Sequence, residues 1–392
     1  MPSIIEIFLR FLKVGATAYG GPAMAAQIKK TIVGECGWLT EPEFMQGVAL
    51  CQLVPGATNV QLSTYIGYRL KGIRGALVSV TAFVLPAFGL LLGLSALYFR
   101  FGSLGFIRAL FKGLGAIVVA IVLNAFLNFG RPVLKDARAA LITVLSFLGF
   151  LARINALLVF VLAGALALLL RPAIAREPAG EARPTVDLRP SSRMHNTLLL
   201  GVLALLVAGT FVVCRLLNAP LFHMSLVLAK LGALAFGGGF TIIPLIQYEV
   251  VSKFHWVSTK EFLDGIAMGQ ITPGPIMITA AFLGYKLAGF WGAALATVAN
   301  FSPSFFIIML VAPYHDKLRG IAAVRVIEQG ILAAFVGMLG LVLYHFGQAA
   351  FVDVPSVIFA AAAFIALLKK IDLAYILLAG AVLSIIVFGI LL

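Results

Sequence analysis

Residues 11–21, FLKVGATAYGG, return later in the chain as residues 228–238, LAKLGALAFGG. The likeness continues downstream, where Trp38 corresponds to Trp256. A duplicated and very apolar chain, with proline and glycine interruptions at matching places, is typical of membrane proteins built from repeats around a central site. The stretch therefore predicts an all-α, polytopic membrane protein made of two helical repeats.

The composition places the chain in a lipid bilayer. Hydrophobic residues make up 62% of it and charged residues 11%, whereas roughly a quarter of residues are charged in soluble domains. The mean hydropathy is +1.08. An apolar run of about 20 residues spans the hydrocarbon core. Such runs lie at residues 75–99, 196–217, 290–313 and 373–392.

The net charge of +14 does not indicate a nucleic-acid partner. The basic residues lie in short loops between apolar segments instead of along one face of a domain. We expect the bilayer and a small solute as partners, and a homo-oligomer is compatible with the sequence.

One long polar interval, rich in proline and arginine, separates the two copies as a flexible linker would. The expected organisation is a first repeat at 1–170, a cytoplasmic linker at 171–195, an extra transmembrane helix at 196–220 and a second repeat at 221–392.

The distribution of basic loops predicts that the two repeats insert upside down relative to each other. Lys and Arg favour cytoplasmic loops, and in the first half they gather at 69–74, 131–138 and the linker. In the second half they gather in the alternate loops instead, at 317–319 and 369–370. The extra helix supplies the odd crossing. We therefore expect a multi-pass plasma-membrane protein with a cytoplasmic N-terminus and linker.

Two matching segments resemble helix starts at a membrane interface. Thr40-x-x-Glu43 and Ser258-x-x-Glu261 are capping boxes, each following a tryptophan and preceding an apolar run. The glutamates are therefore expected to cap helices, and the alternative is that they carry protons.

Those helices run into Pro55-Gly56 and Pro273-Gly274-Pro275, where the helix must stop near mid-membrane. Irregular backbone at that depth is tolerated where it lines a wet cavity, and the next half-helix then points its N-terminal amides at an anion. The alternative is a proline kink between packed helices. The sequence leaves open whether residues 41–70 and 259–288 are broken helices or re-entrant hairpins.

A second paired break carries glycine pairs, each seven residues after a lysine. The matched lysines either contact substrate or extend to an interface. The residues expected to bind substrate are Lys13, Gly20, Gly21, Gln52, Pro55, Gly56, Thr58, Asn59, Gln61, Lys230, Gly237, Gly238, Gln270, Thr272, Pro273 and Gly274. Proton coupling would use Glu35, Glu249 or Asp264.

These motifs together resemble the chromate ion transporter family in its two-domain form. They include YGGP at 19–22, QLSTYIGY at 61–68, GIRGAL at 72–77 and GFWGA at 289–293, so the resemblance covers nearly the whole chain. It implies a plasma-membrane protein that exports chromate, with sulfate as a related oxyanion, driven by an ion gradient or the membrane potential. One departure is Ala57 after Pro55-Gly56, where the family commonly has Pro-Gly-Pro.

No ATP-binding motif occurs, so transport would be secondary, and no cofactor or metal is expected. An anion channel, or a carrier of another small anion, is the main alternative. A membrane-embedded enzyme is disfavoured, because the five histidines are scattered without ligand spacing.

Overall fold

The computed structural model describes residues 2–18, 22–101, 104–134, 136–152, 154, 156–170, 193–217, 219–235, 243–312, 322–371 and 373–391. Every regular element within these ranges is a helix, which confirms the all-α class. Four stretches of the described residues are long and apolar enough to cross a membrane, which confirms a polytopic membrane protein; they are Thr58–Phe101, Gly105–Asn128, Ile276–Val311 and Gln329–Ala350.

The two halves of the chain have the same order of elements, except that the second half has an additional short 3-10 helix, η3 (Ile276–Ile278). The first half contains α1 (Ile4–Thr17), α2 (Pro22–Lys29), the π-helical η1 (Lys30–Glu35), α3 (Glu41–Leu53), α4 (Thr58–Phe101), α5 (Gly105–Val133), α6 (Ala137–Leu151) and α7 (Ala156–Leu169). The second contains α9 (Ala219–Leu234), α10 (Ile243–Gln247), η2 (Tyr248–Lys253), α11 (Thr259–Ile271), η3 (Ile276–Ile278), α12 (Thr279–Val311), α14 (Ala322–Ala350), α15 (Val354–Leu368) and α16 (Leu373–Leu391). Between them, α8 (Arg193–Leu217) has no counterpart.

The longest helix, α4, folds back on itself. Its backbone leaves helical geometry at Lys71 and Gly72, and Gly72 has a φ of 60°, which glycine adopts without strain. The Ser79 hydroxyl donates to the Ser63 carbonyl at 2.8 Å, although a straight helix would separate these residues by about 24 Å. α12 repeats the turn at Gly289, whose φ is 56°.

The same geometry joins α3 to the first segment of α4. Gly47 of α3 lies against Tyr65, so the two helices run antiparallel on either side of the Pro55-Gly56 turn. Gly265 lies against Phe282 in the matching part of the second repeat. Each first arm has 13 residues and is about 20 Å long, short of the 30 Å or so of the hydrocarbon core. The geometry is therefore that of two re-entrant hairpins.

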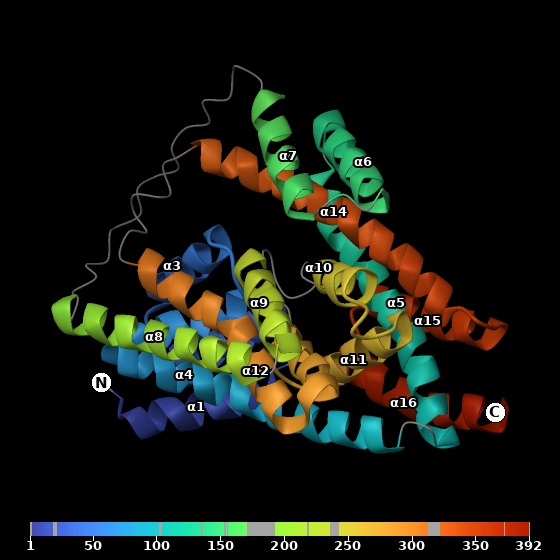
Figure 1. Cartoon of the computed structure of the whole chain (residues 1–392), viewed down its shortest axis with the longest axis horizontal. Helices are drawn as coiled ribbons and strands as arrows, with labels where there is room; N and C mark the ends of the chain where they lie inside the picture. Colours follow the sequence, from blue (N-terminus) through green and yellow to red (C-terminus); the bar gives the residue numbers. More distant parts are fainter. Residues whose placement is uncertain are drawn as a thin grey trace.

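The repeats exchange their last helices. α6 and α7 pack on α14 of the second repeat, while α15 and α16 pack on α5 of the first (Figure 1). Matched glycines make the close approaches, since Gly113 of α5 lies against Ser384 and Gly330 of α14 against Ala163. Reciprocal contacts of this kind are what an approximate two-fold axis between the repeats produces.

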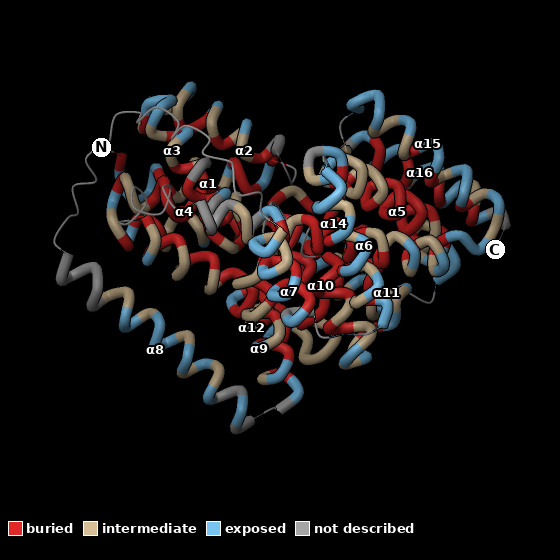
Figure 2. Tube along the Cα trace, turned by 90° about the horizontal axis from the view of Figure 1, so that it is seen from above, coloured by how far each residue is buried: buried red, intermediate tan, exposed pale blue. Residues whose placement is uncertain are grey.

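Burial follows this arrangement. The buried residues lie on the facing sides of packed helices, such as α4 with α12 and α5 with α14, and α8 runs along the outside of the bundle (Figure 2). The outer helices expose large apolar side chains, among them Leu205, Val382 and Tyr375. An apolar exterior of this extent suits contact with lipid.

Candidate functional site

The base of each re-entrant hairpin is fastened by a glutamate, and the predicted capping boxes are confirmed. Glu43 Oε2 accepts from the Thr40 amide at 2.8 Å, and Glu261 Oε2 accepts from the Ser258 amide at 2.8 Å. Each carboxylate also binds a cation from the other arm: Arg69 contacts Glu43 at 2.9 Å, and Lys286 contacts Glu261 at 2.6 Å. These glutamates therefore join the two arms of their hairpins.

The tip of each hairpin docks on the other repeat. The Gly56 amide donates to the carbonyl of Ala235, directly after α9, at 2.5 Å. The Gly274 amide donates to the carbonyl of Ala18, directly after α1, at 2.8 Å. Both glycines have a strongly positive φ, 138° and 122°, which other residues rarely adopt. The predicted helix breaks therefore exist at both Pro-Gly pairs, and each break contacts the opposite repeat.

One residue distinguishes the two tips. The Ala57 amide donates to the Ser304 hydroxyl at 2.8 Å, in a buried contact between the repeats. At the matching position of the second tip, Pro275 has no amide hydrogen to donate. Its tip lies against Ala87, which matches Ser304 and has no acceptor. Ala57, which replaces the second proline of Pro-Gly-Pro, therefore brings an amide that needs an acceptor, and the Ser304 hydroxyl is that acceptor.

Buried amide side chains surround the tips. Gln61 donates from Nε2 to the Pro55 carbonyl at 2.7 Å, and Asn300 donates from Nδ2 to the Met277 carbonyl at 3.0 Å. Within the described part of the chain, Gln61 Oε1, Asn300 Oδ1 and Gln270 Nε2 are buried without a hydrogen-bond partner. Buried polar atoms are rarely left unpaired, and those that are call for a water, an ion or a ligand.

α12 connects the two tips through these polar groups. Asn300 and Ser304 are four residues apart on one face of α12, and they contact the second and the first hairpin respectively. Neither residue was predicted from the sequence to contribute to the site. Comparison of the two copies could have found them, because the matching residues in the first repeat, Phe83 and Ala87, are apolar.

The structure brings together only part of the predicted substrate site. Gln61, Gln270 and Thr272 are buried near the tips, but the Thr272 hydroxyl donates to the carbonyl of Met268 in its own helix at 2.8 Å. Thr58 and Asn59 are half-buried in the first turn of α4, and Gln52 is exposed. The glycines of the other paired break, Gly20, Gly21, Gly237 and Gly238, lie outside the described residues.

The matched lysines lie apart from the tips. Lys13 is exposed on α1. Lys230 binds the buried Glu249 at 2.7 Å, and Lys253 binds the other oxygen of that carboxylate at 3.0 Å. Glu35 is exposed and lies 3.6 Å from Arg10. These charges join α1 to η1 and α9 to η2 across the two glycine breaks.

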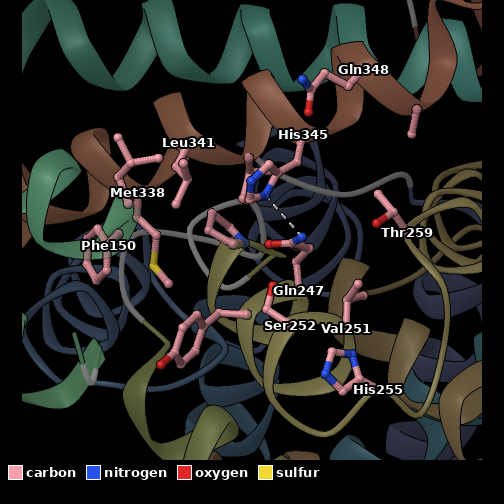
Figure 3. A pocket seen from close by; sticks show the side chains of 15 residues that line it. Phe150, Gln247, Val251, Ser252, His255, Thr259, Met338, Leu341, His345 and Gln348 are labelled. Atoms are coloured by element: carbon pink, nitrogen blue, oxygen red, sulfur yellow. Dashed lines mark hydrogen bonds between the residues drawn. The ribbon is translucent and has the colours of Figure 1, made fainter. Parts of the chain in front are cut away.

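A cavity of about 610 Å³ opens between α10, η2 and α14 of the second repeat and the C-terminal end of α6 of the first (Figure 3). Its polar lining includes Gln247, Ser252, Thr259 and His345, and the Gln247 amide lies 3.4 Å from His345 Nδ1. Of the described residues that line it, none is acidic. It lies at the N-terminal end of α11, whereas the second tip follows the C-terminal end of that helix.

Comparisons with known proteins give the family. The family model described as "Chromate transporter" matches the chain twice, at residues 5–169 and 222–385. An uncharacterized transporter of Methanocaldococcus jannaschii is 33% identical over 98% of this chain and 94% of its own length. The chromate transport protein of Cupriavidus metallidurans is 32% identical over 93% and 88%, and that of Pseudomonas aeruginosa is 28% identical over 90% and 83%. No solved structure matches the chain. The chain therefore belongs to the chromate transporter family.

Proposed function

We propose that this protein is a secondary transporter that exports chromate across the plasma membrane, and that the oxyanion binds between the two hairpin tips. The reciprocal docking of the Pro-Gly tips, with buried amide groups left unpaired around them, is the observation that carries the proposal. The similarity to the chromate transport proteins of Cupriavidus metallidurans and Pseudomonas aeruginosa supports the choice of substrate.

The repeats are inserted in opposite orientations in this proposal. Each repeat is a series of hairpins that return to their starting side, as contacts between Arg10 and Glu35, Glu43 and Arg69, and Tyr98 and Phe111 indicate for the first repeat. The single helix α8 then carries the chain across the membrane once. The second repeat starts on the other side, so alternating access can use two similar gates around one site.

The chemistry of the matched turns supports this orientation. The turn in α4 carries Lys71 and Arg74, whereas the turn in α12 carries Phe290 and Trp291, and Trp291 is strongly exposed. Basic loops favour the cytoplasm and tryptophan favours membrane interfaces. The N-terminus and the first turn are therefore cytoplasmic, and the second turn faces outside.

The site suits an anion that must also leave. Half-helix N-termini provide partial positive charge, and Gln270 Nε2 provides a buried donor. The unpaired oxygens of Gln61 and Asn300 suit bound water or the hydroxyl of hydrogen chromate. An inside-negative potential favours outward movement of a dianion by about 2.3 kcal/mol per charge per 100 mV. ATP is therefore not needed, and the potential or an ion gradient drives export.

The test is uptake of labelled chromate into everted vesicles that carry the wild type, Gln61→Ala, Gln270→Ala, Asn59→Ala or Asn300→Ala. We expect a raised KM in these variants, because each loses a polar group near the substrate. Gln52→Ala is the control, since Gln52 is exposed on the same hairpin, and Lys13→Ala tests the exposed lysine. Unchanged KM and kcat in all four tip variants would remove the tips from the substrate site.

A carrier of another anion, or an anion channel, is the second candidate, because the tips provide neutral groups that do not select charge or size strongly. Competition by sulfate, phosphate and molybdate in the same vesicles ranks the substrates. Saturable uptake with counterflow identifies a carrier, whereas flux that rises linearly with concentration identifies a channel.

A further inference from the structure

Asp264 is a buried carboxylate in the second hairpin, and the proposed anion site does not use it. Asp264 is 2% exposed, and its Oδ2 accepts a hydrogen bond of 2.7 Å from the Tyr98 hydroxyl. Tyr98 belongs to α4, so the bond joins the second hairpin to the first repeat. The Tyr98 ring contacts Phe111 and Phe282, which make the surroundings aromatic.

Asp264 differs from Glu249, the other buried carboxylate among the described residues. Glu249 binds two lysines, whereas Asp264 has no cation within ion-pair distance among the described residues. The matching residue of the first repeat is Gln46, which carries no charge. The carboxylate is therefore a feature of the second repeat alone, and helix capping does not explain it.

Among the described residues, no charged or titratable group on the neighbouring helices other than Tyr98 is bound directly to Asp264. On α11 itself, Lys260 and Glu261 act on Asp264 from a distance, and Glu261 is bound by Lys286 of α12. On α5, Lys112 binds Asp353. His345 of α14 contacts Gln247, Arg100 of α4 lies over Phe101, and Tyr375 of α16 is exposed. Tyr98 is thus the direct polar partner of Asp264.

A carboxylate held away from water without a cation is unfavourable, and an acid kept at such a place in a membrane protein is a functional candidate. Asp264 lies on the arm that ends at Gln270 and the second tip. Its state therefore acts on the hairpin that bears one side of the proposed anion site.

We propose that Asp264 is the proton-binding site that couples chromate export to proton entry, an inference that rests on the proposed transport function. A proton from outside binds a carboxylate oxygen, and the hydrogen bond from Tyr98 weakens because its acceptor is no longer charged. The second hairpin is released from α4, and loss of the proton to the cytoplasm restores the bond. Proton entry and dianion exit both move net positive charge inward, so the membrane potential favours both.

The test uses the full chain in proteoliposomes, with the membrane potential clamped. We expect Asp264→Asn to lower the chromate accumulation driven by a pH gradient about tenfold or more. Chromate counterflow needs no net proton movement, so its rate should stay within about twofold of the wild type. Tyr98→Phe removes the donor that stabilises the carboxylate, so its gradient-driven transport persists to more alkaline pH. Gln46→Ala, at the matching position of the first repeat, keeps the wild-type response.

Accumulation by Asp264→Asn that follows the pH gradient as in the wild type would overturn the proposal. Infrared difference spectroscopy on a pH change provides a readout without chromate, because a titrating buried carboxyl gives a C=O band that Asp264→Asn lacks. If the wild type carries no chromate yet shows this band, the transport function is wrong and the proton site stands. If the band is absent from the wild type, or unchanged in the variant, the proton site is wrong.

Discussion

The two tips differ in sequence at one residue, Ala57 in the first and Pro275 in the second. The Ala57 amide donates a hydrogen bond to Ser304, which a proline could not do. A proline at the second tip needs no acceptor, and an alanine faces it there. Because an unpaired buried amide is unfavourable, the alanine at position 57 and the serine at position 304 depend on each other.

Ser304→Ala should lower the free energy of unfolding by about 1–3 kcal/mol, since it leaves the Ala57 amide unpaired. Ala57→Pro in the same chain should restore most of this loss, because it removes the amide hydrogen and copies the second tip. Thermal unfolding of the four proteins of the cycle in detergent measures the coupling. Additive effects of the two substitutions would contradict the account.

Gly274→Ala should damage the second tip through its backbone. The φ of 122° is strained for alanine, and the added Cβ would lie 2.5 Å from the Ala87 Cβ. We expect a loss of about 1–3 kcal/mol of stability and impaired transport. Ala87→Gly should relieve only the contact, so the double variant stays impaired. Gly89→Ala, which meets no atom within 4 Å, is the control and should behave as wild type.

At the scale of elements, each hairpin base contains a helix cap and an ion pair, and the two differ in their contribution to stability. Glu261 caps α11 and also binds Lys286, whereas Lys286 serves only the ion pair. Glu261→Ala should therefore cost about 1–2 kcal/mol of stability, and Lys286→Ala less than about 1 kcal/mol. Glu43→Ala and Arg69→Ala should repeat this order in the first hairpin. Thermal unfolding tests it, and equal losses within a pair would exclude the capping contribution.

The hairpin bases and tips were predictable because their signals are local. A hydroxyl three residues before a glutamate indicates a helix start, and Pro55-Gly56 indicates a stop. The basic residues at 69–74 predicted a loop where the chain folds back at Gly72, but the sequence did not predict the close contact between the two segments of α4. It depends on Gly67 meeting Gly75, a tertiary contact. Asn300 was missed for the same reason, since only packing brings it to Met277.

At the scale of the whole molecule, the exchanged helices tie the repeats together. α5 lies with α15 and α16, and α14 lies with α6 and α7, so neither repeat buries its own last pair of helices (Figure 1). The sequence predicted the duplication but not the exchange, because matching hydrophobic segments can pack within or between repeats equally well.

The last prediction tests the proposed opposite orientation of the repeats, at the turns of α4 and α12. Lys71→Cys and Trp291→Cys, each in a chain whose Cys36, Cys51 and Cys214 are serine, should react with a membrane-impermeant maleimide from opposite sides. Lys71→Cys should label in everted vesicles and Trp291→Cys in intact cells, because α8 crosses once between hairpins that return to their starting side. Labelling in permeabilised membranes controls for accessibility. Reaction of both cysteines from one side would mean that the repeats are parallel, and the pairing of two opposed gates around one anion site would then fail.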